Sequence, residues 1–301
     1  MTSDGHDEAR SQVTSSEWTG RVGDDISAVI VAFGSSEDLR RCLRTLVDEG
    51  VREIIVVDNA DPFQRRYDEE IDGVRIQFYC PGGNLGYGRA VNLGVSLSTK
   101  PYLVIANPDV EFSHGSVDVL LSTVQDGVIA LAAPKVLNED GTRYPSFREF
   151  PSLGAAAIHG IVGLFSQQTS ATRQYRGDLL DPVVTTKVPW VSGAAFLVSR
   201  RAFEAIGGFD SQYFLYLEDV DLCRRLRVRD LGVYYVPDAV VVHRQGSSSR
   251  LRPLRSRFQH HRSLWIYARS TIVRMPLLLV SGVGIWVRFL LQSLVGHEKK
   301  S

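Results

Sequence analysis

The feature that most constrains the fold is a regular alternation of short, continuously apolar segments with helical patterns, about every 20–30 residues. A helix is expected after the first apolar segment, where Ser35 or Ser36 can cap it, and another is expected around residues 90–97. The strands predicted from the apolar segments are residues 26–33, 53–57, 74–79 and 102–106. Continuous apolar strands separated by helices predict an α/β fold, with a mostly parallel central sheet flanked by helices.

Polar residues follow three of these strands directly. Asp58 comes after the second strand, Asn84 after the third and Asp109 after the fourth. Because ligands bind at the carboxyl ends of the strands in open α/β sheets, these side chains are expected to gather at one edge.

The second half of the chain is less regular. Residues 138–187 hold Pro145, Pro151 and many small residues, which predicts loops and short helices there. The further elements expected are a strand region at 188–198, a helix after the acidic cluster within 210–229, a strand at 233–236 and helices beyond Arg250.

Charge and composition exclude several classes of protein. The 44% of hydrophobic residues can form a full core, which excludes disorder for most of the chain. Cys42, Cys80 and Cys223 are few and widely separated, so neither a disulfide framework nor a structural zinc site is expected, and free thiols suit a reducing cytosol. The acidic, polar N-terminus does not predict a cleavable signal peptide.

Three regions are expected along the chain: a mobile extension over 1–24, a folded domain over 25–249 and a basic, apolar helical tail over 250–301. The 34 basic and 34 acidic residues cancel, yet after Asp238 nine Arg and two Lys face only Glu298, a net charge of +10. Nucleic acid, an anionic membrane surface and a phosphorylated lipid are the partners that such a tail suits.

Asn107-Pro108-Asp109 is the first candidate for chemistry. A carboxylate at the tip of a buried strand can hold a divalent cation that bridges a diphosphate. An ordinary strand-end turn is the alternative, because turns favour all three residue types.

Glu218 and Asp219 form the second candidate, at the predicted start of a helix. Exposed backbone N–H groups there stabilise a carboxylate, which suits a general base. Helix capping by solvated acids is the alternative. His243 is the third candidate: it can supply an imidazole to a metal shared with Asp109, with Arg244 nearby for phosphate, or it can be a structural histidine.

Eight segments, in this order, resemble the family 2 glycosyltransferases, which are inverting enzymes with the GT-A nucleotide-diphospho-sugar transferase fold. The resemblance covers about residues 26–249 and is greatest to bacterial rhamnosyltransferases that act on lipid-linked or cell-wall acceptors. The matching segments are residues 29–33, 56–59, 84–94, 106–109, 191–196, 207–210, 218–222 and 243–247.

The resemblance implies a role for each matching residue. Asp219 corresponds to the catalytic base, Glu218 shapes the acceptor site, and Asp58 recognises the pyrimidine ring. Asp109 and His243 correspond to the ligands of a divalent metal, Mg²⁺ or Mn²⁺. The other substrate-binding residues that it implies are Ala32, Phe33, Asn84, Gly86, Asn92, Asn107, Trp190, Gly193 and Arg244.

Two departures from the family pattern qualify this assignment. The metal-binding DxD motif is reduced to Asn107-Pro108-Asp109, so a non-catalytic sugar-nucleotide-binding protein is an alternative. The Gln-x-x-Arg-Trp motif of processive synthases is missing, which favours the addition of a single sugar. A nucleotidyltransferase is disfavoured because no basic phosphate loop follows the first strand.

The implied donor is dTDP-L-rhamnose, although a UDP-hexose presents the same imide edge to Asp58. The implied acceptor is a polyprenyl-diphosphate-linked or other glycan, not nucleic acid, and a homodimer is left open. Residues 275–295 are apolar but hold Arg288, and basic residues precede them. This pattern predicts a helix that lies in the headgroup region of an anionic membrane, at the cytoplasmic face of the plasma membrane. The alternative is a helix packed on the folded domain.

Overall fold

The structure is a computed structural model that describes residues 22–34, 36–124, 128–151, 182–244, 253–272 and 274–298. Most of the extension expected over residues 1–24 lies outside the described residues, as does the segment that follows Arg244 in the family resemblance. The described chain begins with a one-turn helix, α1 (Val22–Asp25), directly before the first strand.

The N-terminal half is the parallel α/β unit that the sequence predicts. Its central strands pair in the parallel order β4-β2-β1-β5, and Ser36 caps α2 by accepting a hydrogen bond from the Leu39 N–H. Side chains of β1 alternate between a core shared with α2 and a core shared with α3. The elements are β1 (Ile26–Ala32), α2 (Glu37–Asp48), β2 (Glu53–Asp58), β4 (Val74–Pro81), α3 (Tyr87–Leu97) and β5 (Tyr102–Ala106).

The second half makes the sheet mixed, where the sequence predicts it mostly parallel. In the described part of the chain ten strands form one sheet, and its main path runs β3-β4-β2-β1-β5-β11-β7-β12-β6. Strand β11 is antiparallel to both β5 and β7, and β6 is antiparallel to β12, whereas β12 runs parallel to β7. A continuously apolar strand buried on both faces fits either direction, so its sequence does not reveal its orientation.

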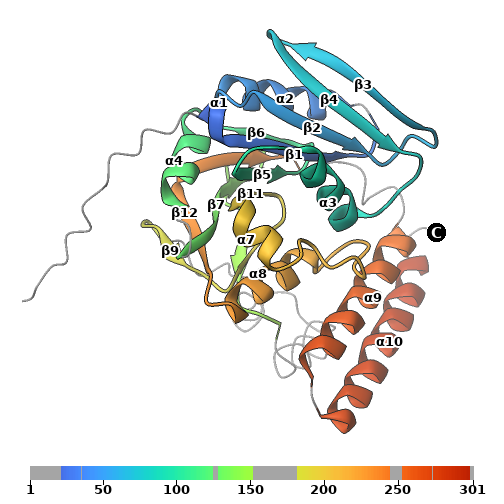
Figure 1. Ribbon diagram of the computed structural model, residues 1–301. Helices are drawn as coiled ribbons and strands as arrows, with labels where there is room; N and C mark the ends of the chain where they lie inside the picture. The colour runs from blue at the N-terminus through green and yellow to red at the C-terminus, as the bar shows by residue number, and fades with distance from the viewer. Residues whose placement is uncertain are drawn as a thin grey trace, which may run out of the picture.

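The remaining elements complete the second half and one edge of the sheet (Figure 1). The charged strand β3 forms a hairpin with β4 through the Asp72-Gly73 turn, where both residues have positive φ. These elements are β3 (Gln64–Ile71), β6 (Val110–Phe112), α4 (Ser116–Thr123), β7 (Ile129–Leu137), β8 (Phe147–Arg148), β9 (Thr186–Lys187), β10 (Trp190–Val191), β11 (Ala195–Ser199), α7 (Arg200–Ala205), α8 (Glu218–Val228) and β12 (Gly232–His243).

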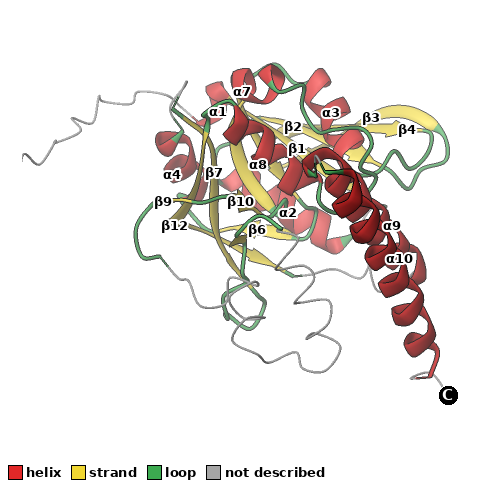
Figure 2. Cartoon of the chain, turned by 90° about the horizontal axis from the view of Figure 1, so that it is seen from below, coloured by secondary structure: helices red, strands yellow, loops and turns green. Residues whose placement is uncertain are grey.

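Two long helices, α9 (Pro253–Thr271) and α10 (Met275–Glu298), end the described chain. They lie side by side and extend away from the sheet (Figures 1 and 2). Gly282 of α10 packs so closely on Trp265 of α9 that a Cβ atom there would stand 2.7 Å from the indole ring. Of the helices that the structure describes, none has the length and apolar character needed to cross a bilayer.

Candidate functional site

Asp58 stands at the carboxyl end of β2, as the sequence predicts. Its Oδ1 accepts hydrogen bonds from the backbone N–H groups of Gly34 and Ala60, both at 2.9 Å. These two donors fix the carboxylate beside the end of β1, where Ala32 is buried and the ring of Phe33 is 58% exposed. An exposed aromatic ring next to an oriented carboxylate can stack on a planar base while the acid accepts a hydrogen bond from its edge.

The loop at residues 84–87 closes over the same edge. Asn84 Oδ1 accepts from the Gly86 N–H at 2.8 Å, and the Asn59 side chain bonds both the Leu85 N–H and the Gly86 carbonyl. Gly86 has a φ of +83°, a backbone conformation that residues other than glycine rarely adopt. The loop is therefore held in one shape between β2 and the start of α3.

Gly86 is also where the two halves of the site meet. A Cβ atom at this position would stand 2.4 Å from the carbonyl oxygen of Phe214, in the loop before α8. That carbonyl accepts a hydrogen bond from the Tyr87 N–H at 3.0 Å. The loop carrying Asn84 is thus joined directly to the loop that leads into Glu218 and Asp219.

Asp109 and His243 meet at the end of the sheet, as the sequence predicts. Asp109 follows β5, His243 ends β12, and the pairing of His243 with Val110 brings them together. The distance from Asp109 Oδ1 to His243 Nε2 is 3.1 Å, and both side chains are largely buried. The ring of Tyr144 meets the imidazole edge-on at 6.0 Å between centroids.

These two side chains fit part of a metal site. Among the described residues no group of three His, Cys, Asp or Glu side chains is placed to hold an ion. One carboxylate oxygen and one imidazole nitrogen are donors that suit Mn²⁺ better than Mg²⁺, which prefers oxygen ligands. A divalent ion here would need further oxygen ligands from a bound diphosphate.

Asp219 lies in the first turn of α8. Its Oδ2 accepts from the Gly193 N–H at 2.9 Å and its Oδ1 from the Val220 N–H at 2.8 Å. A Cβ atom at Gly193 would make ordinary van der Waals contact with the Asp219 side chain, 3.4 Å from its Cβ and 3.6 Å from its Oδ2, so the hydrogen bond does not depend on glycine. Glu218 is buried beside Asp219, and its Oε2 has no hydrogen-bond partner in the described part of the chain.

The two neighbouring acids differ in how their charge is stabilised. Burial, and then the charge of Asp219, raises the pKa of Glu218 well above its ordinary value. Burial also raises the pKa of Asp219, but the N–H groups of Gly193 and Val220 oppose that rise. The surroundings therefore stabilise the charged form of Asp219 more than that of Glu218.

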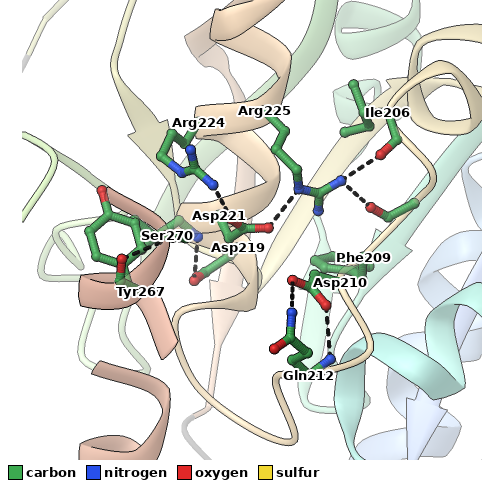
Figure 3. Close-up of polar contacts among 12 residues, drawn as sticks. Ile206, Phe209, Asp210, Gln212, Asp219, Asp221, Arg224, Arg225, Tyr267 and Ser270 are labelled. Carbon is green, nitrogen blue, oxygen red and sulfur yellow. Dashed lines mark hydrogen bonds and ion pairs between the residues drawn. The ribbon is translucent and has the colours of Figure 1, made fainter. Parts of the chain in front are cut away.

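The helix that carries Asp219 is anchored by a buried ion-pair network (Figure 3). Asp221 accepts from Arg224 at 2.8 Å and from Arg225 at 2.6 Å. Arg225 also donates to the carbonyls of Ile206 and Gly208, which precede the loop before α8. Asp221, in the first turn of α8, is thus linked through Arg225 to the chain that precedes that loop.

Several residues implied by the family resemblance have other contacts in the structure. The amide of Asn92 bonds both the N–H and the carbonyl of Phe209, so it holds a turn instead of facing the site. Arg244 is paired with Glu111 at 2.6 Å and with Glu139, so its guanidinium is committed to carboxylates instead of phosphate. The Asn107 N–H donates to the Ala194 carbonyl, which ties the turn before Asp109 to β11. Trp190 donates from Nε1 to the Glu149 carbonyl.

Sequence reasoning missed Tyr87 and Arg148 as site residues. The Tyr87 hydroxyl donates to the Gly193 carbonyl at 3.0 Å, and burial, then the charges of Glu218, Asp219 and Asp109, raise its pKa. Its place directly after Gly86 in a matching segment was the available signal. Arg148 follows Pro145 in a stretch predicted as irregular, and no pattern there distinguished it.

Comparisons with known proteins bear on the family and the fold. Residues 24–269 match the family described as Glycosyltransferase like family 2. The chain is 34% identical over 260 residues to the N-acetylglucosaminyl-diphospho-decaprenol L-rhamnosyltransferase of Mycobacterium tuberculosis, covering 81% of this chain and 84% of that protein. It is 25% identical over 226 residues to the rhamnosyltransferase WbbL of Escherichia coli K12, covering 71% and 81%.

Solved structures show the same fold. The mannosyltransferase PcManGT from Pyrobaculum calidifontis, in complex with GDP-Man and Mn²⁺, has a TM-score of 0.52 at 12% identity, over 92% of this chain and 75% of that one. GalNAc-T7 with UDP, GalNAc and Mn²⁺ has a TM-score of 0.54 at 13% identity, over 80% of this chain. The chain spans about half, 47%, of the length of GalNAc-T7. The architecture is that of the GT-A glycosyltransferases.

Replacing the buried acid Glu218 by Gln is expected to flatten the pH dependence of stability. An acid whose pKa is raised on folding destabilises the protein as pH rises above its ordinary value, 4.5 for glutamate. Urea unfolding should show Glu218→Gln more stable than the wild type at pH 8 by at least about 1 kcal/mol, and nearly equal at pH 4.5.

Glu70→Gln, on the exposed strand β3, is the matched control and should keep the wild-type slope. Equal slopes for Glu218→Gln and the wild type would contradict a raised pKa of Glu218.

Proposed function

This chain belongs to the glycosyltransferase family 2, and we propose that it transfers one L-rhamnose from dTDP-L-rhamnose to a polyprenyl-diphosphate-linked glycan with inversion. The proposal is carried by one observation: two backbone N–H groups orient the Asp219 carboxylate, in the first turn of α8 of a GT-A fold. The rhamnosyltransferase names of the similar proteins support the choice of sugar, and the decaprenol-linked substrate of one of them supports the acceptor.

The proposed reaction is a single in-line displacement. A hydroxyl oxygen of the acceptor sugar attacks the anomeric carbon of rhamnose, the bond from that carbon to the diphosphate oxygen breaks, and dTDP leaves. Asp219 takes the proton of the attacking hydroxyl. One base suffices, because the attack and the departure occur on opposite faces of the anomeric carbon.

Asp109 and His243 would hold a divalent cation beside the leaving diphosphate. The Mn²⁺ in the two similar solved structures supports this assignment, as does the donor set of one carboxylate and one imidazole. The bound cation would supply positive charge against the charge that develops on the diphosphate. The His243 ring already presents Nε2 to Asp109, at 3.1 Å from Oδ1.

Changing the base to its neutral isostere is expected to abolish most turnover but not donor binding. Asp219→Asn should lower kcat by about 10²- to 10⁴-fold, because no group remains to accept the proton. Rhamnosyl transfer to a short-chain N-acetylglucosaminyl diphosphate lipid, measured together with donor binding by calorimetry, provides the test.

Asp230→Asn is the matched control: Asp230 lies just beyond the other end of α8 in a left-handed conformation that Asn tolerates, so this variant should turn over normally. Near-normal turnover of Asp219→Asn would remove Asp219 from the role of base.

The donor base is expected to be a pyrimidine read by Asp58. A ligand that binds only the folded protein stabilises it by about 2.7 kcal/mol at 100 times its Kd. Thermal unfolding with Mn²⁺ should therefore show stabilisation by dTDP-rhamnose, whereas GDP-mannose should have no effect. UDP-glucose, UDP-galactose and UDP-N-acetylglucosamine complete the series, since uracil shares the imide edge of thymine. Stabilisation by GDP-mannose alone would contradict the assignment.

We also propose that the enzyme lies on the inner face of the plasma membrane, through one face of α10. Exposed apolar side chains recur along this helix at spacings of three and four residues, and Arg274 and Arg288 can meet anionic headgroups. The opposite face is used internally, because Trp286 and Phe289 pack on Phe258 of α9. The exposed apolar residues on this face are Leu279, Val280, Val283, Val287 and Leu290, and Met275 and Leu277 are exposed near the start of the helix.

Charges placed on this face are expected to release the protein from lipid. The triple variant Val280→Glu, Val283→Glu, Val287→Glu should fail to sediment with phosphatidylglycerol vesicles, whereas the wild type should sediment, less completely at high salt. The control triple, Val183→Glu, Val184→Glu, Val228→Glu, changes equally exposed valines elsewhere and should sediment like the wild type. Equal sedimentation of the two triples would contradict this mode of binding.

A further inference from the structure

Arg148 is a cation beside the catalytic helix that the proposed mechanism does not use. It lies in β8, directly opposite Trp190 of β10 in a two-stranded antiparallel sheet. Its guanidinium carbon stands 5.8 Å from the centroid of the Trp190 ring. Its Nη2 donates one long hydrogen bond, of 3.5 Å, to the Pro145 carbonyl.

Among the residues that the structure describes, no carboxylate pairs with Arg148, in contrast to Arg225 and Arg244. Arg225 and Arg244 each form ion pairs of 2.6 Å. For Arg148 no ion pair is found within the described ranges, and its Nε is buried without a hydrogen-bond partner. Leaving a guanidinium partly out of water and unpaired is unfavourable, and an anionic ligand would remove that cost.

Arg148 is connected to the start of the catalytic helix through Trp190. Trp190, on which it stacks, packs against the apolar cluster that contains Leu217 and Val220, the residues flanking Glu218 and Asp219. Three residues after Trp190, Gly193 donates its N–H to Asp219, and the next residue pairs with Asn107 at the donor edge. A chain of contacts therefore runs from Asn107 with Ala194, through Gly193 with Asp219, to Trp190 and Arg148.

The charge of Arg148 also reaches the base, since it lowers the pKa of Asp219 against the effect of burial. A cation within electrostatic range of the base, and outside the residues proposed to hold the donor, can bind a second anion. The diphosphate of a lipid-linked acceptor is such an anion, one sugar ring away from the hydroxyl that Asp219 would deprotonate.

We propose that Arg148 binds the diphosphate of the acceptor and so selects diphosphate-linked over neutral glycans. This inference rests on the proposed function, because it assigns the acceptor of the same site. The planar guanidinium can donate two parallel N–H groups to phosphoryl oxygens while its face remains on Trp190. Phosphate recognition thus comes from β8, and not from Arg244, which is paired with Glu111 and Glu139.

Two acceptors that differ only in the anion provide the test. One is an N-acetylglucosaminyl diphosphate with a short alkyl chain, and the other is the neutral alkyl N-acetylglucosaminide. Arg148→Gln should raise KM for the diphosphate acceptor by about 10- to 100-fold, the effect of a lost charge-assisted contact. Its kcat/KM for the neutral acceptor and its KM for dTDP-rhamnose should change less than about threefold.

Two further variants control for folding and for charge. Arg148→Lys keeps the cation but loses the two parallel donors, so it should retain part of the preference for the diphosphate. Arg201→Gln removes an exposed arginine on α7 and should behave as the wild type. Thermal unfolding of each variant without ligand reports folding separately.

The outcomes separate this inference from its competitors. Equal losses on both acceptors would overturn it in favour of an effect on Asp219 alone, and a higher KM for dTDP-rhamnose would assign Arg148 to the leaving diphosphate. If the wild type transfers no rhamnose, the proposed function fails, but the inference is still tested by binding. The diphosphate acceptor, without donor or metal, should then stabilise the wild type and not Arg148→Gln; equal stabilisation would overturn it.

Discussion

The hydrogen bond from the Tyr87 N–H to the Phe214 carbonyl is the contact on which the geometry of the site depends. It joins the loop at the start of α3, which closes the donor edge, to the loop that delivers Asp219. Gly86 makes this contact possible, because any side chain there would strike the same carbonyl. Two residues after Phe214, Tyr216 and Leu217 adopt left-handed conformations that turn the chain into α8. The strain of that turn is tolerated because the Tyr87 hydrogen bond to Phe214 holds the chain before it and the Gly193 hydrogen bond to Asp219 holds the chain after it.

Two adjacent acids can play different parts here because the backbone treats them differently. Glu218 is buried and Asp219 half-buried, and the partial loss of solvent raises the pKa of both. The N–H groups of Gly193 and Val220 stabilise the charged form of Asp219, whereas Glu218 has no such donor on Oε2. To act as a base Asp219 must be ionised, and Glu218 must not add a second negative charge beside it. The division of roles therefore follows from which carboxylate faces Gly193.

The sequence predicted what depends on local pattern and missed what depends on distant partners. Strands β1, β2, β4 and β5, and the strand-end positions of Asp58 and Asp109, follow from apolar runs that end in polar residues. The direction of β11 does not, because a strand buried on both faces carries no mark of direction. Asn92 and Arg244 have site-like chemistry, yet Phe209 and Glu111, far away in the sequence, bind them. Only the fold could reveal that Arg148 has no carboxylate partner among the described residues.

The C-terminal helices contribute to the framework of the site as well as to its surroundings. Ser263 and Arg262 of α9 donate to the carbonyls of Leu215 and Gln212, and Tyr267 packs with Tyr213. These contacts fall on the loop that delivers Asp219, and the family match accordingly extends through residue 269. Helix α10 packs on α9 with one face and exposes its apolar face. Removing residues 250–301 would therefore remove the support of the catalytic loop together with any anchor, whereas charges on the outer face of α10 leave that support in place.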